Sequence, residues 1–335
     1  MKMLDIAAAA GVSRSTVSNV MRDLPSVAPE VRARVLREAE RLGYLYNRGA
    51  ATLRMQQSHL IGLVIPDLAN PFIAEALRGA EEVLVPRGYL VVSARTSDEV
   101  DRQTQILRNL AEHRVDGVML LPAVKTDAGA IMKALNGLPT VLLNRDVPDG
   151  GVEYVGPNEA SVGRLGAAHL VGVHQCRTVA YFGGPELASP RTVRREQFID
   201  AARDMGAEVV EEWSEPCEPT ANAAYIAAQR LMRGSNLPEG IHCHSDEIAF
   251  GVLRALRENS VPISRCRILG TDNVPNSGFA SPSLTTISVD SFAIGQVAAE
   301  RLLRQLGEAP GSHMVVPPAR VVERESCGCQ VVVLG

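Results

Sequence analysis

Aromatic residues and cysteines are scarce in this sequence. Phe, Trp and Tyr make up 4% of the 335 residues, with one Trp, so the cores must consist mainly of Ala, Val, Leu and Ile. The six cysteines are too sparse for a disulfide framework, which indicates a reduced, cytoplasmic protein. No run approaches the ~20 apolar residues of a membrane helix, and the apolar run after Asp5 is too short for a secretory signal. An integral membrane protein is therefore excluded, and a secreted one is not expected.

Motifs for catalysis and metal binding are also missing from the sequence. There is no Gly-x-Ser-x-Gly elbow, no Gly-x-x-x-x-Gly-Lys loop and no His-Glu-x-x-His helix. Cys327-Gly328-Cys329 lacks a second close Cys or His pair. His242 and His244 lie two apart on a predicted strand, without an acid at ligand spacing. We therefore expect no enzyme, no metal and no cofactor; the competing class is a stand-alone sugar receptor or a sugar-processing enzyme.

Charge is distributed unevenly along the chain. Residues 1–59 hold nine basic and five acidic side chains, a net charge of +4, whereas the remainder holds 25 basic and 33 acidic ones, or −8. A small basic module on a larger acidic body is expected where one end of a protein meets a polyanion, although chance could also produce +4. The length is typical of two or three domains.

The basic part of the chain predicts three short helices, at Met3 to Ala10, Arg14 to Met21 and Pro29 to about Leu42. Gly11 can adopt a positive φ and Ser13 is a good N-cap, so a tight turn joins the first two helices. This arrangement is a helix-turn-helix. Its expected apolar faces include Leu4 in the first helix and Leu36 in the third.

The exposed side of the second predicted helix carries side chains suited to DNA. Arg and Asn can read guanine and adenine edges in a major groove, while Ser and Thr suit phosphate contacts. The alternative is a row of solvated polar residues. The candidate DNA contacts are Ser13, Arg14, Ser15, Thr16, Ser18, Asn19 and Arg22.

Several motifs in this region resemble the head of the lac/galactose repressor (LacI/GalR) family. They are Leu4-Asp5-Ile6-Ala7, Gly11-Val12-Ser13, Thr16-Val17-Ser18-Asn19-Val20 and Leu42-Gly43-Tyr44. The resemblance continues through Ile61-Gly62-Leu63-Val64, Asn70-Pro71-Phe72, Asp116-Gly117 and Ser283-Leu284-Thr285-Thr286-Ile287, so it covers essentially the whole chain. It implies a homodimeric repressor that binds double-stranded operator DNA and responds to a small carbohydrate-like effector, with no membrane partner.

The resemblance divides the chain into a helix-turn-helix head at 1–46, a hinge helix and linker at 47–59, and an effector-binding and dimerisation core at 60–335. In the family a hinge helix forms on DNA and a Leu wedges into the minor groove. Asn47 could cap such a helix and Leu53 stands at the wedge position, although Leu53 could instead pack on the neighbouring core. The hinge departs from the family pattern at Tyr46, Gly49 and Ala51, and Gly49 costs ~1 kcal/mol of helix propensity.

Residues 60–335 alternate β-rich runs with helical stretches, which predicts two α/β lobes with parallel sheets. The expected strands of the first lobe are 60–66, 89–94, 116–121 and 140–143, and those of the second are 178–182, 208–212, 240–243, 267–269 and 284–288. Polar or Pro/Gly-rich crossings near 144–158 and 270–290 favour a hinged, periplasmic-binding-protein-like core. The chain also lacks a C-terminal leucine-repeat helix, which favours dimers over tetramers.

Ligands of open parallel sheets bind beyond the carboxyl ends of the strands. The residues expected there include Asn70 and Phe72 after the first strand, and the family's effector pattern adds Asn144, Arg194, Ser245 and Asp272, with Trp213 as the aromatic platform. Such side chains suit a sugar, a sugar acid or a similar polyhydroxylated ligand. Asn144 and Ser245 replace a frequent Asp and a frequent Asn. Asp272 could instead form a turn, and Asp246 is expected to be an N-cap.

Overall fold

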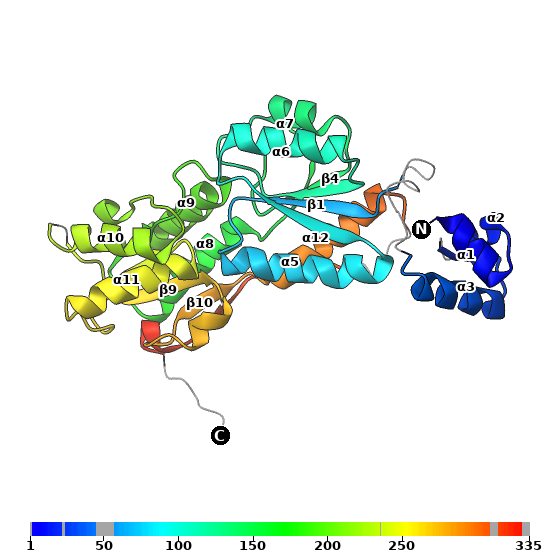
Figure 1. Ribbon diagram of the computed structural model, residues 1–335. Helices are drawn as coiled ribbons and strands as arrows, with labels where there is room; N and C mark the ends of the chain where they lie inside the picture. The colour runs from blue at the N-terminus through cyan, green and yellow to red at the C-terminus, as the bar shows by residue number, and fades with distance from the viewer. Residues whose placement is uncertain (1, 22–23, 45–56, 235, 309–313, 330–335) are drawn as a thin grey trace, which may run out of the picture. The chain divides into compact units, whose positions relative to one another are not determined.

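The computed structural model describes residues 2–21, 24–44, 57–234, 236–308 and 314–329. Contacts divide the chain into two compact units, Met1–Ser58 and His59–Gly335. The helices and strands of the two units are labelled in Figure 1. Within the described residues, no helix combines the length and the apolar character needed to cross a bilayer.

The first unit is a bundle of three helices, α1 (Met3–Ala10), α2 (Arg14–Met21) and α3 (Pro29–Arg41). Gly11 has a φ of 62° and ends α1, and the Ser13 hydroxyl accepts a hydrogen bond from the backbone N–H of Thr16 at 3.1 Å. Both residues therefore form the predicted turn. The buried core consists of Ile6, Ala7, Ala10, Val17, Val20, Val35 and Ala39.

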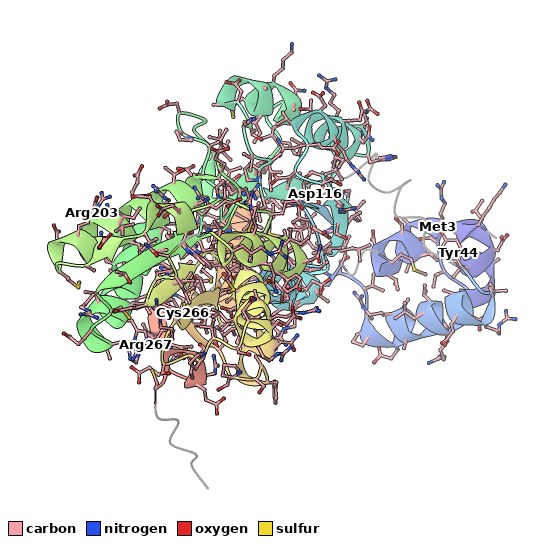
Figure 2. The ribbon with its side chains drawn as sticks, turned by 90° about the vertical axis from the view of Figure 1, so that its left-hand side faces the viewer. Met3, Tyr44, Asp116, Arg203, Cys266 and Arg267 are labelled. Atoms are coloured by element: carbon pink, nitrogen blue, oxygen red, sulfur yellow. The ribbon has the colours of Figure 1, made fainter. Side chains whose placement is uncertain are left out.

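Two core predictions for this unit are wrong. The side chains of Leu4 and Leu36 are 59% and 48% exposed, so they do not belong to its apolar faces. Ala7 and Val35 occupy the inward helical positions instead. Met3 and Tyr44, at the two ends of the described bundle, pack against the core (Figure 2).

The second unit contains two α/β lobes. The sheet of the first lobe has the order β2-β1-β3-β4-β5, and all its strands are parallel. Its strands are β1 (Leu60–Ile65), β2 (Leu90–Arg95), β3 (Gly117–Leu120), β4 (Thr140–Leu143) and β5 (Glu153–Val155). Its helices are α5 (Pro71–Leu84), the short η1 (Val85–Arg87), α6 (Val100–Glu112), α7 (Ala128–Leu135) and α12 (Ser291–Gln305).

Helices cover both faces of this sheet, with α6 and α7 on one side and α5 and α12 on the other (Figure 1). Helix α12 comes from the far end of the chain and packs closely on α5. A Cβ added at Gly79 of α5 would meet the carbonyl oxygen of Phe292, and one added at Gly295 of α12 would meet that of Ala76. The two glycines therefore allow the helix backbones to approach each other.

The sheet of the second lobe has the order β11-β10-β9-β8-β6-β7, and it is parallel except where β11 meets β10. Its strands are β6 (Thr178–Phe182), β7 (Glu208–Val209), β8 (Gly240–Cys243), β9 (Arg267–Asp272), β10 (Thr285–Ser288) and β11 (Arg320–Val322). Its helices are α8 (Glu159–Ala167), the π-helix η2 (Ala168–Val173), α9 (Ser189–Asp204), α10 (Ala221–Leu231) and α11 (Asp246–Glu258), with short turns η3 (Glu211–Trp213), η4 (Pro275–Gly278) and η5 (Glu325–Cys327).

The chain passes between the lobes three times, after β5, before α12 and after α12. The first two crossings were predicted from the sequence. Strands β5 and β11 were not, because each has three residues and no alternating pattern. The expected strand at 208–212 is shorter than predicted, since a 3₁₀ turn begins at Glu211.

Candidate functional site

The outward face of α2 is the first candidate site. Val17 and Val20 are buried in the bundle, which turns Arg14 and Ser15 to solvent, while Ser18 and Asn19 are half-buried. Among the described residues, no hydrogen bond or ion pair holds the side chain of Arg14 or Asn19. These two side chains are therefore available to a partner outside the bundle.

The hydroxyl groups at the start of α2 form a small network of their own. Ser13 Oγ lies 2.7 Å from Ser15 Oγ and 2.9 Å from Thr16 Oγ1. This network fixes the N-terminal turn of α2, whose free N–H groups can bind an anion such as a phosphate. Arg22, Asn47 and Leu53, together with Tyr46, Gly49 and Ala51, lie outside the described residues.

The second candidate site is a cavity of about 670 Å³ between the two lobes of the second unit. This volume lies in the range of small-molecule sites. Its walls come from the segments that follow β1, β2, β3, β4, β6 and β8, so it lies at the carboxyl ends of both parallel sheets. Six predicted residues line it: Asn70, Phe72, Asn144, Arg194, Ser245 and Asp272.

The prediction that Trp213 is the aromatic platform of the effector site is wrong. Trp213 is fully buried in the second lobe, tilted against Phe182 with 6.1 Å between ring centroids, and it is not part of the cavity lining. The chain turns into η3 immediately before it, which directs the indole into the core. Phe72, which is 6% exposed, supplies the aromatic surface of the cavity instead.

Arg194 is held by groups of the second lobe. Its Nε donates to Glu159 Oε2 at 2.7 Å, and its Nη1 donates to the His244 carbonyl oxygen at 2.6 Å. Burial alone would lower the pKa of Arg194, but the charges of Glu159, Tyr181 and Asp272 raise it above its usual value. Arg194 therefore presents a fixed cation at the cavity wall.

The His244 ring extends this network. Its Nδ1 lies 2.8 Å from the hydroxyl of Tyr181. Burial lowers the pKa of His244 well below its usual range, and the charges of Arg194 and Arg145 lower it further. The ring is therefore neutral near pH 7 and can donate or accept a hydrogen bond at the cavity wall.

The prediction that Asp246 is an N-cap is also wrong. The cap of α11 is Ser245, whose Oγ accepts from the backbone N–H of Ile248 at 3.4 Å. Asp246 is buried and accepts from the backbone N–H of Val274 at 2.9 Å and from the Ser277 hydroxyl at 2.6 Å. Burial raises its pKa to about 6.

Asp272 ends β9 with a φ of 116°, in the region that favours glycine. Burial and the charge of Asp246 raise the pKa of Asp272 well above its usual range. A strained backbone that aims a carboxyl group into a cavity is typical of functional positions. The position of Asp272 in the cavity lining fits the prediction that it contacts a ligand. Its backbone φ also fits the alternative prediction, that it forms a turn.

Asp98 lines the cavity and was not predicted from the sequence. Arg145, which was expected with Asn144 at the end of the strand 140–143, lines it as well. Arg145 Nη1 lies 2.6 Å from Asp98 Oδ1. Asp98 follows strand β2, whose end the sequence predicts, so the same strand-end argument could have found it.

The balance of charge in the cavity is negative. Three arginines line it, and each is paired: Arg95 with Asp67 at 3.7 Å, Arg145 with Asp98 at 2.6 Å and Arg194 with Glu159 at 2.6 Å. Four further acids line it without an ion pair among the described residues: Glu186, Glu218, Glu247 and Asp272. Such a surface favours ligands rich in hydrogen-bond donors over anions.

Family models match two parts of the chain. Residues 2–47 match the model for bacterial regulatory proteins of the lacI family, and residues 167–327 match a periplasmic binding protein-like domain. The "Ribose operon repressor" of Halalkalibacterium halodurans is 31% identical and aligns over 96% of both chains. The "HTH-type transcriptional repressor PurR" of Mannheimia succiniciproducens is 26% identical over 96% of this chain and 97% of that protein.

A solved structure shares the fold of the whole chain. The crystal structure of the lac repressor dimer bound to operator and the anti-inducer ONPF superposes with a TM-score of 0.81 at 23% identity, over 98% of this chain and 99% of that one. A helix-turn-helix unit joined to a two-lobed, periplasmic-binding-like core defines a class of DNA-binding transcriptional regulators. The chain belongs to the lacI family of bacterial regulatory proteins.

Proposed function

We propose that the protein is a repressor that binds a pseudo-palindromic operator as a homodimer, and that a small effector in the cavity between the lobes controls its affinity for DNA. The observation that carries this proposal is the presence, in one chain, of an unengaged polar face on α2 and a cavity of about 670 Å³ at a topological switch point. Relatives named as a ribose operon repressor and as the transcriptional repressor PurR support it.

The homodimer follows from the size of the head. A single recognition helix reads too few bases for specificity, so two heads on a two-fold symmetric operator are needed. Arg14, Ser15 and Asn19 are the residues for base edges, and Ser13, Thr16 and Ser18 are suited to phosphates. Arg22, Asn47 and the wedge residue Leu53 remain predictions from the sequence.

The effector is a neutral, polyhydroxylated molecule, a sugar rather than a sugar acid. The three cavity arginines are already paired, whereas Glu186, Glu218 and Glu247 offer carboxyl oxygens to hydroxyl donors, and the buried carboxyl group of Asp272 can donate as well as accept. Asn144 can donate and accept, and Phe72 offers an apolar face for a sugar ring. An anionic ligand would add a charge to a negative surface without a free arginine to neutralise it.

Control of DNA binding requires that the effector binds one arrangement of the lobes better than the other. The cavity residues come from both lobes, with Asn70 and Asn144 in the first and Arg194 and Asp272 in the second. A ligand that contacts both lobes therefore favours their closure around it, with the three chain crossings as the hinge. The hinge residues 47–59 precede the first lobe directly, so closure can be transmitted to the head.

A thermal-shift screen tests the effector proposal. We expect neutral pentoses or hexoses to raise the melting temperature, because a ligand at 100 times its Kd adds about 2.7 kcal/mol of stability. Sugar acids, sugar phosphates and purine bases form the comparison arms. Asp272→Ala should abolish the shift, and Asp204→Ala, at the end of α9 outside the cavity lining, should retain it. A shift caused by purines or sugar phosphates alone would refute the neutral sugar.

A further inference from the structure

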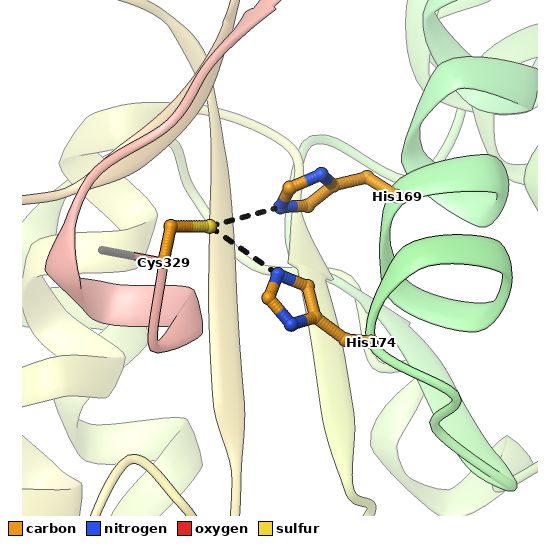
Figure 3. A group of neighbouring side chains, drawn as sticks. All are labelled: His169, His174 and Cys329. Carbon is orange, nitrogen blue, oxygen red and sulfur yellow. Dashed lines mark hydrogen bonds between the residues drawn. The ribbon is translucent and has the colours of Figure 1, made fainter. Parts of the chain in front are cut away.

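Outside the cavity, one cluster of metal-ligating side chains stands out among the described residues. His169, His174 and Cys329 each offer one ligand atom, and these atoms lie within 4.8 Å of one another. Cys329 Sγ lies 3.3 Å from His174 Nε2 and 3.9 Å from His169 Nε2. Figure 3 shows both imidazole rings directing a nitrogen toward the sulfur atom.

The π-helix η2 is what brings the two histidines together. The backbone N–H of His174 donates to the carbonyl oxygen of His169 at 3.1 Å, a bond across five residues. In an α-helix, residues five apart point about 140° away from each other. The wider π turn places both rings on one face, with centroids 4.7 Å apart. π-turns of this kind occur frequently at functional sites.

The spacing fits a tetrahedral metal. Zinc bonds of about 2.3 Å to sulfur and about 2.05 Å to nitrogen imply a sulfur-to-nitrogen distance of about 3.6 Å at a tetrahedral angle. The two observed distances, 3.3 Å and 3.9 Å, lie on either side of this value. Small side-chain movements therefore suffice for all three atoms to reach one ion.

The surroundings also suit a metal. His174 and Cys329 are half-buried, which gives an ion a path from solvent. Water can complete the fourth position, since the cluster consists of three ligand residues among those that the structure describes.

We propose that His169, His174 and Cys329 form a zinc site that joins the C-terminal segment, η5 and Cys329, to η2 in the second lobe. Two imidazoles and one thiolate are a ligand set typical of zinc. No metal was expected from the sequence, because no second Cys or His pair lies near Cys329 along the chain. The fold supplies that pair from 155 and 160 residues away. The site is independent of the proposed effector cavity, whose lining contains none of these residues.

The test is zinc binding by the full-length protein after chelator treatment and dialysis. We expect about one zinc ion per chain at micromolar zinc, measured by mass spectrometry of the metal content. Cys329→Ser and His174→Gln should each lose that ion. Cys217→Ser and His113→Gln are the matched controls, since neither residue belongs to the cluster, and both should retain it. Circular dichroism verifies that each variant is folded.

Cobalt(II) provides a second readout. Wild-type protein should show the near-ultraviolet charge-transfer band of a cobalt–thiolate bond, Cys329→Ser should lose this band, and Cys217→Ser should keep it. Zinc should also raise the melting temperature of the wild-type protein and not that of Cys329→Ser. Wild-type protein without tightly bound zinc, or equal binding by Cys329→Ser, would overturn the proposal. Neither result would bear on the proposed effector cavity, because none of the three ligand residues lines it.

Discussion

Arg194 shows how a single residue can serve a binding site and the fold together. Its guanidinium group lines the cavity, yet its side chain is 4% exposed and bonded to Glu159, which is 8% exposed. Removing one partner of a buried ion pair leaves an uncompensated charge, which costs much more than breaking an exposed pair. Substitutions of Arg194 should therefore affect stability as well as ligand binding.

We expect Arg194→Ala to lower the free energy of unfolding by about 3–5 kcal/mol, because Glu159 would be left buried without its partner. Arg203→Ala is the matched control on the same helix α9. Its ion pair with Glu211 has side chains that are 57% and 50% exposed, so its loss should cost less than about 1 kcal/mol. Urea unfolding measures both, and equal losses would contradict the structural role of Arg194.

The buried His242 should make stability depend on pH. Burial, with the charges of Arg194 and His169, lowers the pKa of His242 well below 6.5 in the folded protein. The unfolded chain therefore binds more protons below pH 6.5, and the contribution of His242 to stability falls as pH falls.

A titration of stability from pH 7 to pH 5 tests this effect. The limiting slope for one histidine is about 1.4 kcal/mol per pH unit. Asp246, whose pKa is raised to about 6, acts in the opposite direction over part of this range, so the comparison is between wild type and His242→Asn. The wild-type curve should fall more steeply with acidification, and parallel curves would rule out His242 as the source.

At the scale of elements, α2 illustrates a helix with two distinct faces. Val17 and Val20 contribute to the core of the three-helix bundle, whereas Arg14 and Asn19 remain without partners among the described residues. A polar face on so short a helix adds nothing to the core. We expect these side chains to contact bases.

Asn19→Ala should therefore weaken binding to the true operator by about 1–3 kcal/mol and leave binding to random DNA nearly unchanged. Fluorescence anisotropy at one fixed salt concentration measures both affinities. The control is Glu40→Ala on α3, which is exposed and lies on another helix. Equal losses on both kinds of DNA would remove Asn19 from base readout.

The contact between α5 and α12 is a second feature at this scale. Gly79→Ala should destabilise the second unit by about 1–3 kcal/mol, because the new methyl group would meet the backbone of Phe292. Gly234→Ala is the control, since a Cβ there meets no atom within 4 Å. Thermal unfolding compares the two, and a neutral Gly79→Ala would show that the helices can separate without cost.

At the scale of the whole molecule, the assembly follows from the need to read two operator half-sites. We expect a stable dimer at micromolar concentration, measured by light scattering, both with and without DNA. A monomer that binds the operator with full affinity, or a stable tetramer, would contradict this expectation.

Local sequence patterns were sufficient for most helices and strands. The predicted ends of α1, α2, β4, β6 and β8 agree with the structure residue for residue. Because parallel strands end at one edge of their sheet, the residues after the first strand predicted Asn70 and Phe72 in the cavity lining, and the family resemblance predicted four further members. These features depend on short-range periodicity and on a general property of parallel sheets.

Other features depend on contacts between distant segments, which only the tertiary structure decided. An aromatic residue near a strand end can face a cavity or a core, and the 3₁₀ turn at η3 directed Trp213 into the core. The local sequence was compatible with Asp246 as a helix cap. In the structure its carboxyl group accepts hydrogen bonds from Val274 and Ser277 instead, which lie about 30 residues away. Cys329 meets His169 and His174 only because a π-helix turns both rings toward it, and no local pattern in the sequence encodes that meeting.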